Sequence, residues 1–141
     1  MIARMSEQPP AAPSAEKPEG PAKPENPEKP ENPEDRKLIT LARSARARNG
    51  VPEGAAVRDE TGRTYVAGTV DLASLRLTAL QTAVAMAVAS GAKSLEAAAV
   101  VTAAGTPADA DRAAVRDLGG PGTPVILAGP DGTVRTTVPA G

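Results

Sequence analysis

The stretch LEAAAVV at residues 95–101 decides the fold, because it is apolar apart from Glu96 and has the length of one buried strand. Helical patterns flank it, over residues 75–90 and over residues 109–118. A glycine follows each helical stretch, as is common where helices end. A buried strand that follows a helix suggests a crossover connection, which links parallel strands of one sheet. We therefore expect an α/β fold.

Further elements extend this pattern in both directions. Each is a short run of helix or strand character bounded by turn residues. We expect a helix over 35–48 and strands over 54–58, 63–70, 125–128 and 133–138. Turns are expected over 59–62 and 129–132. The second turn is short enough to make the last two strands antiparallel. The expected order is α-β-β-α-β-α-β-β, a three-layer α/β/α sandwich with a mixed sheet, in a domain over residues 36–141.

The core of this domain is thin, because its expected strands carry mostly Ala and Val. A core of this kind in about a hundred residues is marginally stable on its own. The helix over residues 75–90 is apolar on nearly all sides, whereas a sheet covers only one of them. We therefore expect a homo-oligomer that associates through this helix, with Leu80 and Met86 as the candidates for outward-facing positions.

Residues 1–35 differ in composition from the rest of the chain. They hold nine of the 15 prolines, and after Ile2 they contain no Leu, Val or aromatic residue. The hexapeptide KPENPE at 23–28 is repeated at 29–34. We expect a disordered tail of polyproline II character that serves as a spacer, with a ligand for a proline-binding domain as the alternative. No apolar signal-peptide core follows Arg4, so we expect a cytoplasmic protein.

The composition excludes several classes of site. The chain has no Cys and no His, which rules out a disulfide scaffold, a cysteine nucleophile and catalysis by histidine. The formal net charge is −1, so no global basic field attracts nucleic acid. Arg43, Arg46 and Arg48 lie near the end of the first helix, where cations suit the helix dipole, and a nucleic-acid-binding stripe is the alternative. No membrane partner is expected, because the long apolar helix is too short to span a bilayer.

Several segments, in their order and spacing, resemble the small zinc-dependent cytidine deaminases. They are GAAV at 54–57, DETGR at 59–63, AVASG at 87–91, AVV at 99–101 and TPVILAGPDG at 123–132. The resemblance covers residues 36–138. It implies the fold of that family and a zinc-bound water, held by a His or Cys at one helix start and two Cys at another, with a nearby Glu that moves the proton.

The first motif of that family resembles C-A-E-R, and the matching stretch of this chain is TALQ at 78–81. Thr78 stands at the position of the first zinc ligand, and Leu80 stands at the position of the catalytic Glu. The resemblance therefore implies that both functions are lost from the start of this helix.

The second motif resembles P-C-x-x-C-R and matches PADADR at 107–112. Ala108 and Asp111 stand at the two cysteines, so the three ligand positions retain one oxygen donor. Asp109 and Asp111 would suit a hard cation, but carboxylates in a first helical turn also favour the helix dipole. Catalytic zinc needs three protein ligands. We expect no zinc or other cofactor, no catalytic residue, and hence a protein that is not an enzyme.

The ribose-binding pattern of the family, N-x-E, matches TVD at 69–71. Asp71 is the best single candidate for ligand binding, with a solvent-exposed carboxylate at a strand end as the alternative. Arg112, which matches the arginine of the second motif, is a further candidate. Val51 stands where a Phe is usual in the family, so a ring-stacking residue is missing.

Three functions are consistent with this sequence. The first is a catalytically inactive member of the family that acts as a binding or scaffold module, with its protein partner undetermined. The second is a functioning cytidine deaminase that hydrolyses cytidine to uridine, which the missing zinc ligands oppose. The third is an accessory protein that binds RNA or the ribosome through Arg43, Arg46 and Arg48.

Overall fold

The computed structural model describes residues 32–141. Its elements in chain order are α1 (Pro33–Asn49), β1 (Gly54–Asp59), β2 (Thr64–Gly68), β3 (Val70–Asp71), β4 (Arg76–Leu77), α2 (Ala79–Ala89), β5 (Leu95–Val101), α3 (Asp109–Gly119), β6 (Pro124–Ala128) and β7 (Val134–Pro139). The predicted order is confirmed, and β3 and β4 are added to it.

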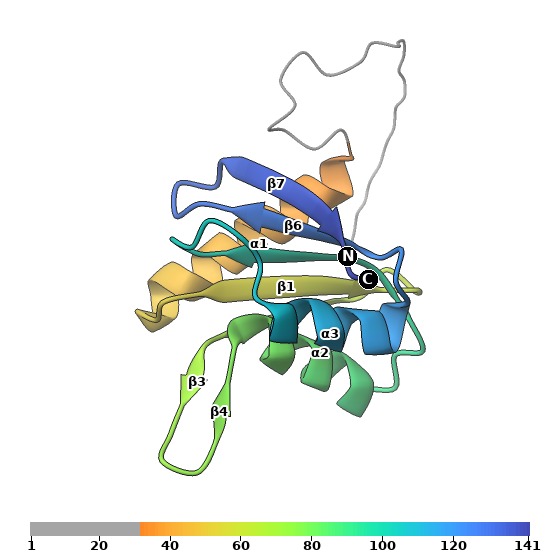
Figure 1. Cartoon of the computed structure of the whole chain (residues 1–141), viewed down its shortest axis with the longest axis horizontal. Helices are drawn as coiled ribbons and strands as arrows, with labels where there is room; N and C mark the ends of the chain where they lie inside the picture. The colour runs from red at the N-terminus through yellow and green to blue at the C-terminus, as the bar shows by residue number, and fades with distance from the viewer. Residues whose placement is uncertain (1–31) are drawn as a thin grey trace, which may run out of the picture.

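Five strands form one mixed sheet in the order β2-β1-β5-β6-β7. Strands β5 and β6 are parallel and are joined by α3, whereas every other neighbouring pair is antiparallel. Figure 1 shows α1 on one side of the sheet and α2 and α3 on the other. The predicted three-layer α/β/α sandwich with a mixed sheet is therefore confirmed.

Two cores fill the space between these layers, because successive residues of a strand point to opposite faces. Ala56 and Ala99 pack beneath Leu38 of α1, while Ala55 and Ala98 face α2 and α3 on the other side of the sheet. The layer of α1 lies very close to the sheet. A Cβ atom at Gly54 would come within 2.0 Å of the Ala42 carbonyl oxygen, so only glycine fits at the start of β1.

The helix expected over residues 75–90 begins later than predicted, at Ala79. Thr78 is its N-cap: the Thr78 side chain accepts a hydrogen bond from the Gln81 amide, and the Gln81 side chain accepts one from the Thr78 amide. The residues before it form the β3–β4 hairpin, which projects from the body of the molecule as an arm (Figure 1). The strand expected over 63–70 accordingly ends at Gly68, where the chain leaves the main sheet.

The exposed side of α2 is apolar, as the sequence predicts. Met86 and Val88 are 40% and 54% exposed, and a groove beside them lies between α2 and α3. Leu80, however, is fully buried against the sheet, so the expectation that it faces outward is wrong. The helix turns Leu80 inward because it shares a face with Ala83, Val84 and Ala87, which all belong to the same core.

The boundary of the folded domain lies before the predicted position. Pro33 occupies the first turn of α1, and the Asn32 side chain caps that turn by accepting a hydrogen bond from the Glu34 amide at 2.8 Å. The last residues assigned to the tail therefore belong to the first helix. The other expectations for the tail, including the first copy of its repeat, lie outside the described residues. No helix within residues 32–141 has the length and apolar character needed to cross a membrane.

Candidate functional site

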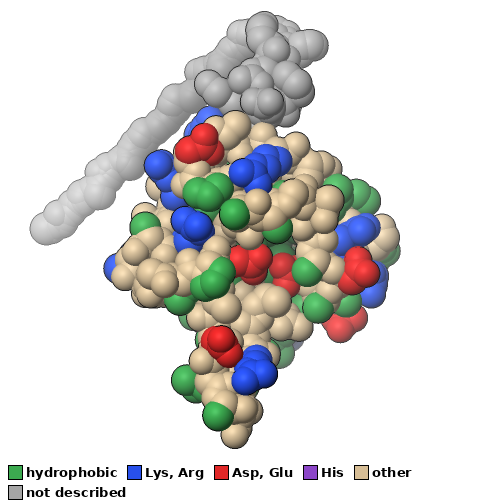
Figure 2. Space-filling model, turned by 60° about the vertical axis from the view of Figure 1, so that its left-hand side comes forward, with side chains coloured by type: hydrophobic (Ala, Val, Ile, Leu, Met, Phe, Trp, Pro, Cys, Tyr) green, Lys and Arg blue, Asp and Glu red, His purple; other side chains and the backbone are tan. Residues whose placement is uncertain are grey.

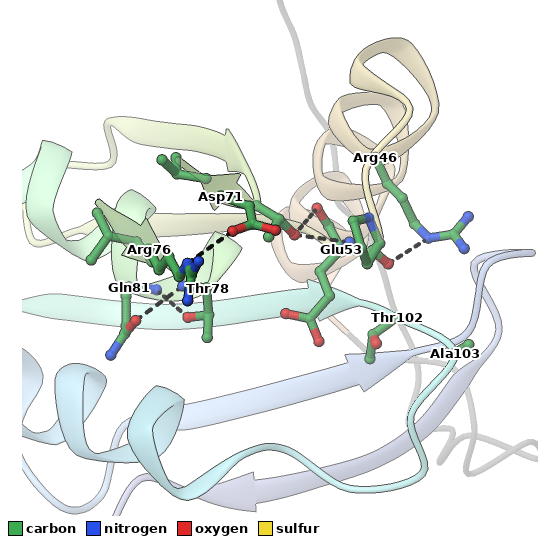
Figure 3. Close-up of a pocket in the computed structure, with 12 residues that line it drawn as sticks. Arg46, Glu53, Asp71, Arg76, Thr78, Gln81, Thr102 and Ala103 are labelled. Carbon is green, nitrogen blue, oxygen red and sulfur yellow. Dashed lines mark hydrogen bonds and ion pairs between the residues drawn. The ribbon is translucent and has the colours of Figure 1, made fainter. Parts of the chain in front are cut away.

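A cavity of about 510 Å³ opens between the α1–β1 loop, the β3–β4 arm, the start of α2 and the end of β5. Figure 2 shows acidic side chains beside a hollow near the centre of this face, above the projecting arm. Most of the cavity wall is apolar, and the few polar side chains come from elements distant in sequence (Figure 3). A largely apolar concavity with a few convergent polar groups is the usual form of a small-molecule site.

Glu53 contributes a carboxylate to this cavity from the loop before β1 (Figure 3). Its backbone is held by Thr69: the Glu53 amide donates to Thr69 Oγ1 at 3.1 Å, and the Thr69 amide donates to the Glu53 carbonyl oxygen at 3.2 Å. Within residues 32–141 the Glu53 carboxylate has no hydrogen-bond or ion-pair partner of its own. It is therefore available to a ligand.

Thr78 lies at the inner end of the cavity and joins two helices. Its hydroxyl accepts the Gln81 amide hydrogen, as the N-cap of α2, and donates its own hydrogen to Oδ1 of Asp111 at 2.5 Å. Asp111 lies in the first turn of α3. One hydroxyl group thus connects the N-terminal ends of α2 and α3.

Asp111 is a buried carboxyl group, with 2% of the residue exposed. Burial raises its pKa above the ordinary value, the hydrogen bond from Thr78 opposes that shift, and the negative charge of Glu53 adds to it. Asp111 therefore retains its proton to a higher pH than an ordinary carboxyl group. It does not line the cavity itself and meets it only through its hydrogen bond with Thr78.

The predicted ligand-binding residues lie at different places relative to the cavity. Asp71 lines its rim on β3, is largely exposed and forms an ion pair with Arg76 at 3.2 Å. Arg112 does not line the cavity, because its guanidinium donates to the Pro139 carbonyl oxygen at 3.1 and 3.3 Å. Ligand binding by Asp71 or Arg112 stays a prediction.

The other positions that the sequence analysis names do not all meet at one place. The structure brings Thr78 and Asp111 together, but Leu80 points into the core and Ala108 is an exposed N-cap of α3 without a side-chain hydrogen bond. Of the arginines of α1, Arg43 donates to the Pro130 carbonyl oxygen at 3.1 Å and Arg46 donates to the Pro52 carbonyl oxygen at 2.9 Å. These two side chains thus anchor separate loops, and RNA binding stays a prediction.

Sequence reasoning missed Glu53, Gln81 and Thr102 as lining residues. The sequence does hint at the position of Glu53. An acidic residue directly before a strand that is buried throughout must place its carboxylate at the end of that strand. Thr102 directly follows buried β5 in the same way, at the neighbouring end of the sheet. Only the pairing of β1 with β5 brings the two residues to one cavity.

Comparisons with known proteins identify similar folds. The family described as cytidine deaminase-like matches residues 31–132. The solved cytidine deaminase from Burkholderia pseudomallei is 30% identical, with a TM-score of 0.66 over 74% of this chain and 91% of that chain. The cytidine deaminase from Mycobacterium leprae is 26% identical, with a TM-score of 0.57 over 72% of this chain and 90% of that chain. Among curated protein sequences, none matches.

These comparisons contradict the expectation that the chain is not an enzyme. Both solved structures are cytidine deaminases, so the comparisons point to an enzyme. The expectation rested on the missing zinc ligands. The absence of zinc ligands excludes only a water molecule activated by zinc at the family's metal positions. It does not exclude catalysis by other side chains.

The residues at the family's metal positions do not fit a zinc ion. The Thr78 hydroxyl is engaged by hydrogen bonds to Gln81 and Asp111, and Ala108 has no donor atom. In the described part of the chain, no three His, Cys, Asp or Glu side chains gather closely enough to hold a metal. Because catalytic zinc needs three protein ligands, the residues at these positions do not make a catalytic zinc site.

Proposed function

Because the chain belongs to the cytidine deaminase-like family, we propose that it binds a pyrimidine nucleoside in the cavity between Glu53 and Thr78. The observation that carries this proposal is the cavity itself, which lies where the α1–β1 loop, the arm and the start of α2 meet. Nucleoside binding is also the first step of a nucleoside deaminase reaction. The proposal therefore agrees with an enzyme without naming the chemistry that follows.

The size and lining of the cavity support a ligand of this class. Small-molecule pockets measure roughly 300–1,000 Å³, and this cavity of about 510 Å³ lies within that range. Glu53 offers hydrogen-bond acceptors, while Gln81 and Thr102 offer both donors and acceptors. Apolar side chains such as Val70 and Leu77 cover the rest of the wall and suit the faces of a base.

The expected affinity is modest, because no aromatic side chain is free to stack on a base. Tyr65 is the one aromatic residue of the chain, and it is buried with its hydroxyl donating to Asp59. At about −0.3 kcal/mol per non-hydrogen atom, a nucleoside of about 17 such atoms binds with about −5 kcal/mol, a Kd of about 0.2 mM.

Isothermal titration calorimetry tests this proposal directly. Cytidine and uridine are titrated into the full chain, with free ribose as the control that lacks a base. We expect one binding site per chain for at least one of the nucleosides and markedly weaker binding of ribose. Absence of binding by either nucleoside at millimolar concentration would refute the proposal.

Deamination of cytidine is the second candidate, favoured by the activity named for the similar solved structures. The reaction adds the oxygen of water to C4 of the base and releases the amino group as ammonia. Glu53, which lines the cavity, would accept a proton from that water and pass it to the departing amino group. The test measures uridine and ammonia formed by protein treated with a chelator; product above the protein-free background supports the candidate, and its absence rejects it.

A further inference from the structure

We propose that the ligand of the cavity is a pyrimidine nucleotide and that Arg46 binds its phosphate group. This inference rests on the proposed nucleoside binding and adds to it the charged part of the ligand. It is carried by the position of Arg46 in the cavity wall and by the nitrogen atoms that this side chain leaves unpaired.

Arg46 lines the cavity from the last turn of α1 and is half-buried. Its Nε donates a hydrogen bond to the Pro52 carbonyl oxygen at 2.9 Å, which restrains the guanidinium. Within residues 32–141 the terminal nitrogens Nη1 and Nη2 have no hydrogen-bond or ion-pair partner. A guanidinium held at one nitrogen presents the others in a fixed direction, and this geometry suits two oxygens of one phosphate group.

The other charged side chains of the wall do not suit an anion. Arg76 also lines the cavity, but its Nε lies 3.2 Å from Oδ1 of Asp71, and these two side chains are 74% and 77% exposed. Glu53 adds a further negative charge. A phosphate group close to either carboxylate would be repelled. In the described part of the chain, Arg46 is therefore the lining residue that offers an anion both free donors and a positive charge without a counter-ion.

The arrangement of the lining residues suits an elongated ligand with one charged end. Figure 3 shows Thr78 and Gln81 at one end of the row of labelled side chains and the Arg46 guanidinium toward the other end, with Glu53 between them. The end at Thr78 and Gln81 carries no charge and can hold the base. A nucleotide has the same order, because its ribose separates an uncharged base from an anionic phosphate.

The phosphate group should strengthen binding measurably. Near neutral pH a phosphate monoester carries between about one and about two negative charges. Charge-assisted hydrogen bonds to a half-buried guanidinium should tighten binding at least about tenfold relative to the nucleoside. The expected Kd is therefore about 20 μM or less, compared with about 0.2 mM for cytidine. Because Arg46 is only half-buried, salt should reduce this advantage.

Calorimetry on the full chain at about pH 7.5 tests the inference. It compares cytidine with cytidine 5′-monophosphate and cytidine 3′-monophosphate, with inorganic phosphate as the control that lacks a nucleoside. Each titration is made in about 0.05 M and about 0.5 M sodium chloride. We expect at least one monophosphate to bind about tenfold more tightly than cytidine at low salt, and the difference to shrink at high salt. Inorganic phosphate should bind more weakly than that nucleotide.

Variants of Arg46 separate phosphate binding from support of the loop at Pro52. Arg46→Gln and Arg46→Lys both remove the Nε hydrogen bond to Pro52, but only Arg46→Lys keeps the positive charge. Arg48→Gln is the control, because Arg48 is exposed in the same turn of α1 and does not line the cavity.

The measured quantity is the Kd of cytidine divided by the Kd of the nucleotide. A rearranged loop would weaken both ligands alike and leave this ratio unchanged. The ratio should fall to about one in Arg46→Gln, stay above about three in Arg46→Lys and keep its wild-type value in Arg48→Gln.

Four results would overturn the inference. They are nucleotides that bind the wild type no more tightly than cytidine, a nucleotide advantage that salt does not reduce, a ratio that persists in Arg46→Gln, and an equal loss of the ratio in Arg48→Gln. Each of these leaves nucleoside binding by the wild type intact. Failure of the wild type to bind cytidine or either monophosphate would instead refute the proposed function together with this inference.

Discussion

The hydroxyl of Thr78 donates a 2.5 Å hydrogen bond to Oδ1 of Asp111, and the two residues are 33 positions apart in the chain. This contact joins the first turns of α2 and α3, the two helix starts that carry the metal in the zinc deaminases to which the sequence is similar. A direct hydrogen bond thus links the two helices at that place. Thr78, but not Asp111, lines the neighbouring cavity.

Replacement of Thr78 tests the structural part of this contact. Thr78→Val removes both the N-cap of α2 and the hydrogen bond to Asp111, whereas Thr78→Ser keeps a hydroxyl at the same place. Loss of a cap costs about 1 kcal/mol, and a buried carboxyl left without its partner costs a further 1–3 kcal/mol or so. Urea denaturation should show about 2–4 kcal/mol of destabilisation for Thr78→Val and less than about 1 kcal/mol for Thr78→Ser. Equal effects of the two variants would contradict the account.

Asp59 makes stability depend on pH in acid. Burial disfavours its charge, but hydrogen bonds from Thr61, Tyr65 and Arg63 outweigh burial and lower the pKa of Asp59 from 3.8 to about 2. A lowered folded-state pKa stabilises the protein above pH 3.8, and this contribution is lost as the pH falls toward 2. Urea denaturation should show stability falling through that window for wild type and a smaller slope for Asp59→Asn. The slope should persist in Asp109→Asn, whose exposed carboxylate makes no hydrogen bond within residues 32–141.

The apolar outer side of α2 leads us to propose self-association. Met86→Glu places a charge on a side chain that is 40% exposed, so it should dissociate an oligomer while the monomer stays folded. Thr40→Glu, at an exposed position of α1, is the control and should leave association unchanged. Leu80→Glu is not a suitable test, because Leu80 is fully buried and a charge there would unfold the domain. Light scattering that finds the wild type monomeric at 14.2 kDa would refute this prediction.

Metal content gives a separate check of the site. Because Thr78, Ala108 and Asp111 do not make a three-ligand zinc site, the purified chain should contain far less than one zinc per molecule. Treatment with a chelator should leave its melting temperature unchanged. One tightly held zinc per chain in elemental analysis would contradict this prediction and show that residues other than Thr78, Ala108 and Asp111 supply ligands.

The sequence predicts the sheet better than it predicts the start of α2. Strands β5 and β6 are short apolar runs bounded by turn residues, and both form as expected. Leu75 and Leu77 continue the helical spacing of the apolar residues of α2 toward the N-terminus. This spacing led to the prediction of a helix that starts at residue 75. The side chains of Thr78 and Gln81 instead cap the helix at Ala79. The leucines before the cap belong to the arm, and Leu75 is 49% exposed.

The candidate site is predicted only in part, because it is assembled from distant segments. The resemblance to cytidine deaminases draws attention to Thr78 and Asp111, but only the packing of α2 against α3 shows that they touch. Glu53 belongs to no motif. Its role depends on a loop that the pairing with Thr69 holds at the mouth of the cavity. Its place before a buried strand hints at a strand-end position, but only the tertiary structure shows which residues it faces.

Nuclear magnetic resonance of the full chain, labelled with nitrogen-15 and titrated with cytidine, tests the central claim most directly. We expect the resonances of the backbone amides around the cavity to shift in proportion to one another and to saturate together; these are the amides of Glu53, Thr69, Thr78, Gln81 and Thr102. The amides of Val88 and Leu118, which line the groove between α2 and α3, should stay in place. A spectrum that does not change at millimolar cytidine, or that changes only around Val88 and Leu118, would contradict it.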